Sequence, residues 1–265
     1  MFKDNKIKLF LLMTFALMYI PSFITIILLR TNTFLFSTPV IQILQFIAGG
    51  SPTIIAFYIV YYQYNQDKRD DFLSRLFKYK VSPFWWIYAI TLPFLIMIFL
   101  QFIYYQDLNQ VSFELSIWLR LPLILLISIF AGGLEEIGWR GVLFVEMKGK
   151  YSIIMLTLII GILWAIWHLP LFFIKELAFS DKNFLLYLLS TIMFSGFLSF
   201  LIIKTRSIAL AVIMHASINT AANYGDILPA NQGFRIYLGL IILIFISLYL
   251  IYKTKPEEEV MIDSN

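Results

Sequence analysis

Long apolar runs leave this chain few ways to fold. A helix needs about 20 apolar residues to cross the hydrocarbon core of a bilayer, and on that measure we count about eight spans. We therefore expect an all-α, polytopic membrane protein. The predicted spans are residues 9–29, 39–62, 83–105, 117–147, 151–174, 184–203, 207–223 and 235–252.

Composition indicates the same class. Hydrophobic residues make up 60% of the chain and charged residues 14%, whereas soluble domains are about 45–50% apolar and about 25% charged. We predict a single integral-membrane domain over residues 1–265, with an acidic cytoplasmic tail at residues 256–265. The first apolar run is too long for a signal-peptide core, so we expect it to be a retained span. The chain has no cysteine, which excludes disulfides, thiol nucleophiles and cysteine metal ligands.

Lysine and arginine predict the orientation. They gather in alternate loops, near residues 3–8, 68–80, 148–150, 204–206 and 253–255, while the opposite loops carry Arg30, Lys175, Lys182 and Arg235. Both termini should therefore be cytoplasmic. The use of Phe, Ile, Leu, Asn and Lys is typical of an AT-rich bacterial genome, so we expect a bacterial plasma membrane. No basic aromatic patch accompanies the charge, so nucleic acid is not an expected partner, and the sequence does not indicate an oligomeric state.

Three segments depart from a plain span. Residues 117–147 are too long for one crossing, and should project into the cytoplasm or bend at Gly132-Gly133. Residues 207–223 are short, as expected of a helix surrounded by protein. Residues 66–82 place Phe72, Leu73, Leu76 and Phe77 at helical spacing among charges, which predicts an amphipathic helix on the inner membrane face. A solvated loop is the alternative for that segment.

The stretch Glu135-Glu136-Ile137-Gly138-Trp139-Arg140 puts three ionisable groups inside an apolar run. Each such group near the centre of a span costs roughly 2.5–3.5 kcal/mol on the insertion scale, so the cluster needs a reason. Residues four apart share a helix face, so Glu136 and Arg140 can pair. Glu135 lies about 100° round the helix and has no partner within its segment. We assign the pair to structure and Glu135 to chemistry. A purely structural charge network is the alternative.

The chain's two histidines lie in other predicted spans. If the chain turns near Gly149, Glu135 and His168 differ in depth by only about 7 Å, and their side chains lean toward each other. Trp164 covers the same face as His168, and Pro170 should kink the helix. His215 and Asn219 share one face of the short seventh span. Although a lone histidine is often a packing residue, intramembrane polar groups mark functional sites by default.

These residues predict a site built by spans 4, 5 and 7, with Glu135, His168, His215 and Asn219 as its catalytic groups. Glu135 and the two histidines could bind a divalent ion such as zinc. Equally, Glu135 and His168 could activate water while His215 and Asn219 stabilise an oxyanion. The sequence does not separate these two arrangements, and it indicates no other cofactor.

Other intramembrane chemistries fit less well. A zinc protease of the HExxH type needs two histidines four residues apart on one helix. A serine protease needs a nucleophile in a tight glycine context, which Ser195-Gly196 does not supply. A non-enzymatic membrane scaffold or immunity factor is the alternative to an enzyme. A proton- or ion-coupled transporter is a further rival, although the sequence shows no repeat or pair of broken helices.

The motif set resembles the CAAX-protease and bacteriocin-processing (CPBP, or Abi) intramembrane endopeptidases. That family's motifs are EExxxR, FxxxH or a near variant, and HxxxN. The resemblance implies that Glu135 and His168 activate water, that His215 and Asn219 stabilise the oxyanion, and that Glu136 and Arg140 position the first helix. It also leaves a metal open. The three motifs read here as Glu135-Glu136-x-x-x-Arg140, Trp164-x-x-x-His168 and His215-x-x-x-Asn219.

The resemblance also implies a substrate class. The family's eukaryotic branch cuts prenylated C-terminal tails, whereas a bacterial member is expected to cut peptides or membrane-protein segments. The expected roles are leader- or signalling-peptide processing and bacteriocin immunity. We therefore predict a peptide or membrane-protein substrate, cleaved within or near the cytoplasmic half of the bilayer.

Overall fold

The computed structural model describes residues 5–106, 115–222 and 233–254. Within these ranges the chain is helical and contains no strand. Seven helical stretches there are long and apolar enough to cross a membrane, which confirms the predicted all-α, polytopic membrane class. They are α1 (Asn5–Arg30), α2 (Pro39–Tyr62), α4 (Pro83–Tyr105), the interrupted stretch Leu119–Met147, the stretch Ile153–Phe173, α9 (Phe184–Thr205) and α11 (Phe234–Tyr252).

The predicted seventh span is α10 (Ile208–Ala222), which has 15 residues. At 1.5 Å per residue it is about 22 Å long, shorter than the hydrocarbon core of about 30 Å. Leu210, Met214 and Ala216 on α10 are fully buried. The helix is therefore enclosed by protein, as the sequence predicts. The expected acidic tail, residues 256–265, lies outside the described residues.

The long fourth span is broken into short pieces, and the bend falls at Gly132-Gly133 as predicted. Gly132 has a φ of +150°, a conformation that residues with a Cβ rarely adopt. A Cβ on Gly132 would also collide with the Asn219 side chain. The pieces are α5 (Leu115–Phe130), the 3₁₀ turn η2 (Gly133–Glu135), α6 (Glu136–Gly138), the π-helical η3 (Trp139–Leu143) and α7 (Phe144–Met147).

The turn predicted near Gly149 is also present. Gly149 has a φ of +77°, which a glycine adopts without steric strain. The Ser152 side chain then caps α8 (Ile153–His168) by accepting from the Met155 amide at 3.3 Å. Regular α-helix ends at His168, and Pro170 lies in the 3₁₀ turn η4 (Leu169–Phe173) that follows. His168 is therefore the last residue of α8.

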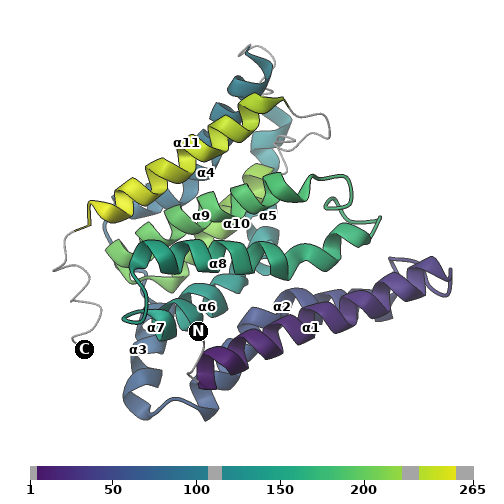
Figure 1. The fold of residues 1–265 in the computed structure, drawn as a ribbon, viewed down its shortest axis with the longest axis horizontal. Helices are drawn as coiled ribbons and strands as arrows, with labels where there is room; N and C mark the ends of the chain where they lie inside the picture. Colours follow the sequence, from purple (N-terminus) through teal and green to yellow (C-terminus); the bar gives the residue numbers. More distant parts are fainter. Residues whose placement is uncertain (1–4, 107–114, 223–232, 255–265) are drawn as a thin grey trace.

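The helices form a bundle whose two flanks differ (Figure 1). α1 packs along α2 on one flank, and α11 packs against α9 and α4 on the other. α8 packs on α9, while α10 packs on α4 and α5. The start of α1, the α7–α8 turn and the end of α11 lie at the same, left-hand end of Figure 1. The candidate site residues come from η2, α6, α8 and α10.

The predicted amphipathic helix is α3 (Gln66–Leu76), capped by Asn65. The helix is present as predicted, and Phe72, Leu73 and Leu76 on its apolar face pack on the protein core, while its place at the inner membrane face stays a prediction. Phe72 is fully buried and its ring contacts Phe57, with ring centroids 6.1 Å apart. Phe77, which we assigned to the same apolar face, is 70% exposed because it follows the end of the helix.

Candidate active site

Glu135 and His168 face each other across a gap. Glu135 Oε1 lies 4.0 Å from His168 Nε2, and both side chains are almost completely buried. The other carboxylate oxygen, Oε2, accepts from Trp164 Nε1 at 2.9 Å. Trp164 was predicted only to form a wall, but it also supplies the partner that Glu135 lacks within its own segment. The residues of spans 4 and 5 are thus brought together.

The orientation of His168 follows from its place at the end of α8. Its Nδ1 atom lies 2.9 Å from the carbonyl oxygen of Trp164, one turn earlier. A carbonyl oxygen can only accept, so Nδ1 carries the proton. When the ring is neutral, Nε2 is therefore an acceptor and faces the Glu135 carboxylate. This tautomer follows from the bonding partners of the ring.

Aromatic rings enclose the His168 imidazole. The ring centroids of Trp167, Phe179 and Tyr187 lie 4.5, 5.6 and 5.4 Å from that of the imidazole. Tyr187 comes from the first turns of α9 and was missed by sequence reasoning, since no spacing in that apolar span singled it out. These rings restrict water around His168 and fix the plane of the imidazole.

Glu136 occupies the centre of a second cluster. Arg140 Nη1 lies 3.0 and 3.1 Å from its two carboxylate oxygens, so the predicted pair is present. Both residues are fully buried. Glu136 Oε1 also lies 2.9 Å from His215 Nδ1, a contact that the sequence did not indicate. An ionised carboxylate only accepts, so His215 Nδ1 donates to it.

Trp164 connects the two clusters. Its ring lies edge-on to the His215 ring, with centroids 4.9 Å apart. The Arg140 guanidinium carbon lies 5.5 Å from the Trp164 ring centroid, on the ring face. Arg140 Nε and Nη2 have no hydrogen-bond partner among the described residues. Glu136 and the π-face of Trp164 are therefore the main compensation for this buried charge.

Asn219 lies beside the bend in the fourth span. Its Nδ2 donates to the Ala131 carbonyl at 3.4 Å. A Cβ placed on Gly132 would lie 3.3 Å from His215 Nε2 and would collide with Asn219 Nδ2. The two side chains of α10 therefore share the space that Gly132 leaves open, as the predicted common face requires.

Helix α2 supports these clusters from behind and was not foreseen as part of the site. Thr53 donates to the Leu134 carbonyl at 2.6 Å, and Ser51 accepts from Trp167 Nε1 at 3.2 Å. Gly138 lies so close to α2 that a Cβ there would approach Pro52 Cβ to 2.7 Å. The sequence signal was the small residue at position 138, which allows the backbones to meet.

The predicted metal site needs three donors that converge on one point. Among the described residues, no group of three or more His, Cys, Asp or Glu side chains is arranged to hold a metal ion. His168 Nδ1 is held by the Trp164 carbonyl, and His215 Nδ1 is held by Glu136. Binding by Glu135, His168 and His215 would therefore have to use the Nε2 atoms of the two histidines, and zinc stays a prediction.

The comparisons with known proteins agree with the motifs. The family model described as type II CAAX prenyl endopeptidase Rce1-like matches residues 116–221, which include the residues of both clusters. The chain is 27% identical over 229 residues to CAAX prenyl protease 2 of Methanococcus maripaludis, with 80% of this chain and 82% of that protein covered. The resemblance drawn from the three motifs is confirmed. It indicates that the chain is a membrane protease.

Proposed function

From this resemblance to the Rce1-like CAAX endopeptidases, we propose that the protein hydrolyses a peptide bond of a membrane-associated peptide or protein. Water is the nucleophile. The observation that carries the proposal is the gap of 4.0 Å between Glu135 Oε1 and His168 Nε2. Both atoms are acceptors when Glu135 is ionised and His168 is neutral, so one water can bridge them by donating a hydrogen bond to each.

Such a bridging water is polarised from two sides. As it attacks the scissile carbonyl carbon, one of its protons passes to Glu135 or His168, and a tetrahedral intermediate forms. The same group can then return the proton to the leaving amine as the carbon–nitrogen bond breaks. The hydrogen bond from Trp164 to Glu135 Oε2 leaves Oε1 directed at the gap.

We assign His215 and Asn219 to the oxyanion. Preorganised donors that meet developing negative charge commonly contribute about 3–4 kcal/mol each to transition-state stabilisation. Asn219 can donate from Nδ2 directly. His215 Nδ1 is engaged by Glu136, so Nε2 can donate only when both ring nitrogens carry protons. The proposed role therefore requires the imidazolium form of His215.

The substrate class is the finer part of the proposal. The relative's name concerns a CAAX prenyl protease, so a peptide held at the membrane by a prenylated cysteine near its C-terminus is one candidate. Leader peptides, signalling peptides and bacteriocin-related peptides are the others. A membrane-associated substrate of any of these kinds suits a site enclosed by apolar spans.

We also propose that both termini are cytoplasmic in a cell membrane. The loops rich in lysine and arginine predict it. The start of α1 and the end of α11 lie at the same end of the bundle as α3, which is consistent with that orientation (Figure 1). Cysteine labelling of Asn5→Cys and Lys253→Cys variants, at two exposed positions, with an impermeant reagent in spheroplasts would test it. Labelling of intact spheroplasts at either position would contradict the orientation.

The activity is tested with purified protein in nanodiscs. The probe is a fluorescent peptide ending in a farnesylated CAAX sequence, and the same peptide without the farnesyl group is the comparison. We expect cleavage by the wild-type protein and a rate lower by about 100-fold or more in the Glu135→Gln variant. Cleavage of the unmodified peptide at the same rate would remove the prenyl group from the substrate class. Loss of cleavage in the presence of a zinc chelator, restored by zinc, would favour the metal alternative.

A cellular experiment separates the enzyme from the scaffold. The peptide profile of cells with wild-type protein is compared with that of cells with the Glu135→Ala variant at equal abundance. A peptide that disappears in the variant is a candidate cleavage product, and a longer species that accumulates there is the candidate natural substrate. If the Glu135→Ala protein restores every phenotype of a deletion strain, the protein acts by binding and the enzymatic proposal is wrong.

A further inference from the structure

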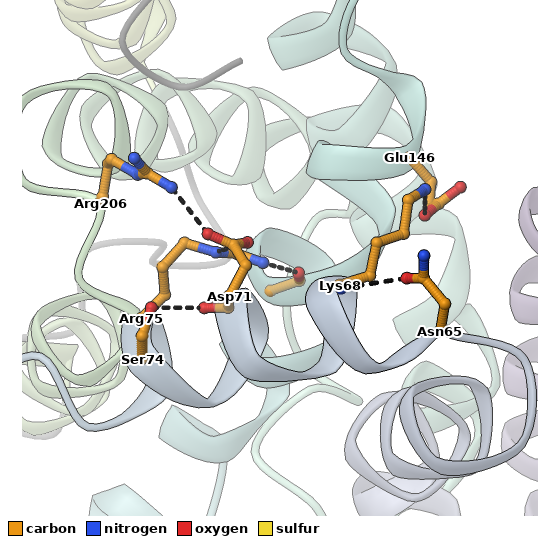
Figure 2. Close-up of polar contacts among 8 residues, drawn as sticks. Asn65, Lys68, Asp71, Ser74, Arg75, Glu146 and Arg206 are labelled. Carbon is orange, nitrogen blue, oxygen red and sulfur yellow. Dashed lines mark hydrogen bonds and ion pairs between the residues drawn. The ribbon is translucent and has the colours of Figure 1, made fainter. Parts of the chain in front are cut away.

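Helix α3 carries a partly buried ionic network that the proposed mechanism does not use. Figure 2 shows this network, in which Asp71 lies between the guanidinium groups of Arg75 and Arg206. Arg75 Nε donates to Asp71 Oδ2 at 2.8 Å, and Arg206 Nη2 donates to Asp71 Oδ1 at 2.7 Å. Arg75 is only 5% exposed. A charge buried this far needs partners on every side, so the network has a defined geometry.

One arm of the network reaches the segment that carries Arg140. Arg75 Nη2 donates to the Gly141 carbonyl at 3.3 Å, and Gly141 lies in the π-helical η3 directly after Arg140. A Cβ on Gly141 would lie 3.1 Å from both Phe72 and Ile208. At this point η3 is therefore in contact with α3 on one side and α10 on the other. π-Helical turns are rare and have weaker geometry than α-helix, so outside contacts help to hold them.

The other arm reaches the start of α10. Arg206 has a φ of +54° in the tight turn between α9 and α10. Ser207 then accepts from the Leu210 amide at 3.1 Å, and its hydroxyl donates to the Lys78 carbonyl in the connection that follows α3. Burial and the neighbouring Arg206 lower the pKa of Lys78. Asp71 therefore supplies the negative charge between Arg75 and Arg206. Without it, the positive charges of α3 and of the α9–α10 turn would repel each other.

One arm ends on η3 and the other on α10, and the buried contact between Glu136 and His215 joins these two parts of the chain. Glu136 precedes η3 by a few residues, and His215 lies on α10. Their contact between Oε1 and Nδ1 is 2.9 Å, a distance that small movements of either element would change. We propose that Asp71, Arg75 and Arg206 form a positioning network that holds η3 and α10 in the register that this contact requires. Only the predicted change in kcat rests on the proposed function, whereas the positioning of η3 and α10 does not.

Helix α3 also supplies a matched control. Lys68 forms an ion pair with Glu146 of α7 at 3.3 Å, and its side chain is 55% exposed. This second tether starts from the same helix but reaches neither Gly141 nor Arg206 (Figure 2). Lys68→Gln therefore weakens the attachment of α3 without touching the proposed network.

The test compares Arg75→Ala, Arg75→Lys, Asp71→Asn and Lys68→Gln in nanodiscs. We expect Arg75→Ala and Asp71→Asn to lower kcat on the farnesylated peptide by about 10- to 100-fold while KM changes less than about twofold, because misplacement by about 1 Å carries a penalty of that size. Arg75→Lys keeps the charge but loses the planar fork, so it should restore part of kcat. Lys68→Gln should stay within about twofold of wild type.

A second measurement does not depend on activity. The chain has 2 histidines, so selective ¹⁵N labelling gives side-chain signals from His168 and His215 alone, assigned with a His168→Gln variant. Arg75→Ala and Asp71→Asn should shift the His215 signals and leave the His168 signals in place. If the wild-type protein cleaves no probe, the proposed function fails, yet these spectra still decide the positioning role.

The proposal is overturned if both network variants keep wild-type kcat and wild-type His215 signals below their melting temperatures. A lower melting temperature alone would mean that the network only stabilises the fold. If Arg75→Ala does not fold, Asp71→Asn decides, because it keeps the size of the side chain while it removes the charge and turns one of the two acceptor oxygens into a donor. Equal shifts of His215 in Lys68→Gln would also contradict the proposal, since they would show a general loosening of α3.

Discussion

Two adjacent glutamates in this protein each lie near a histidine, but only one of them contacts it directly. Glu136 contacts His215 directly at 2.9 Å and is neutralised by Arg140, so its cluster is closed by direct contacts within the protein. Glu135 stops 4.0 Å short of His168, and no lysine or arginine among the described residues forms an ion pair with it, so its pair is open. The same two side-chain types thus give a structural unit in one case and a water-sized gap in the other. The difference lies in what surrounds each carboxylate.

The open pair should be the more sensitive to chemistry. Glu135→Gln keeps the shape and the hydrogen bond from Trp164 but removes the charge that polarises the water. We expect kcat to fall by about 10²- to 10⁴-fold, the range of a general base, while the melting temperature changes little. Steady-state kinetics with the farnesylated peptide and thermal unfolding measure the two effects. Activity within tenfold of wild type would exclude Glu135 as the base.

The closed pair should be the more sensitive to stability. Glu136→Ala leaves Arg140 buried with its principal partner removed, and it also frees His215 Nδ1. We expect a loss of about 3–5 kcal/mol in the free energy of unfolding, typical of a buried pair that loses one member. The double variant Glu136→Leu with Arg140→Met should recover most of that stability. Equal destabilisation by Glu135→Ala would erase the distinction between the two glutamates.

The sequence anticipated the helical part of this arrangement better than the contacts between helices. The pair Glu136 and Arg140, the bend at Gly132-Gly133 and the common face of His215 and Asn219 all follow from spacing along one helix, and the structure contains each of them. The approach of Glu135 to His168 followed from the depth of two residues in a hairpin. Such features depend on 1.5 Å and 100° per residue, which a sequence displays directly.

Contacts that need the packing angle of two helices were not predicted. Nothing in the spacing of Glu136 indicates His215, 79 residues later, and nothing in α9 singles out Tyr187. Helix α3 was assigned to the membrane face because an amphipathic pattern reads the same against lipid as against protein. The packing of Phe72 beside Gly141 is visible only in the structure. The catalytic roles themselves stay predictions until the variants are measured.

Trp164 offers a way to shift the balance between the two clusters, because it touches both. Trp164→Phe keeps the aromatic ring for His215 and Arg140 but removes the donor to Glu135 Oε2. A hydrogen bond to a charged group contributes about 1.5–3 kcal/mol, so kcat should fall about 10- to 100-fold. The effect on unfolding should be smaller than that of Glu136→Ala. Trp164→His, which retains a ring N–H, is the variant expected to restore part of the activity.

Tyr187 should give the smallest effect of the residues that contact the open pair. Its ring packs against His168 with centroids 5.4 Å apart, and Tyr187→Phe leaves that packing in place while it removes the hydroxyl. If the ring serves only to exclude water and to fix the imidazole plane, kcat should stay within about threefold of wild type. That change is smaller than the effect of losing one ordinary hydrogen bond. Tyr187→Ala should instead lower kcat further, because water would enter beside His168 and compete with the bridging water. A large loss in Tyr187→Phe would show that the hydroxyl takes part in the chemistry, and the open pair would then be a site of three groups.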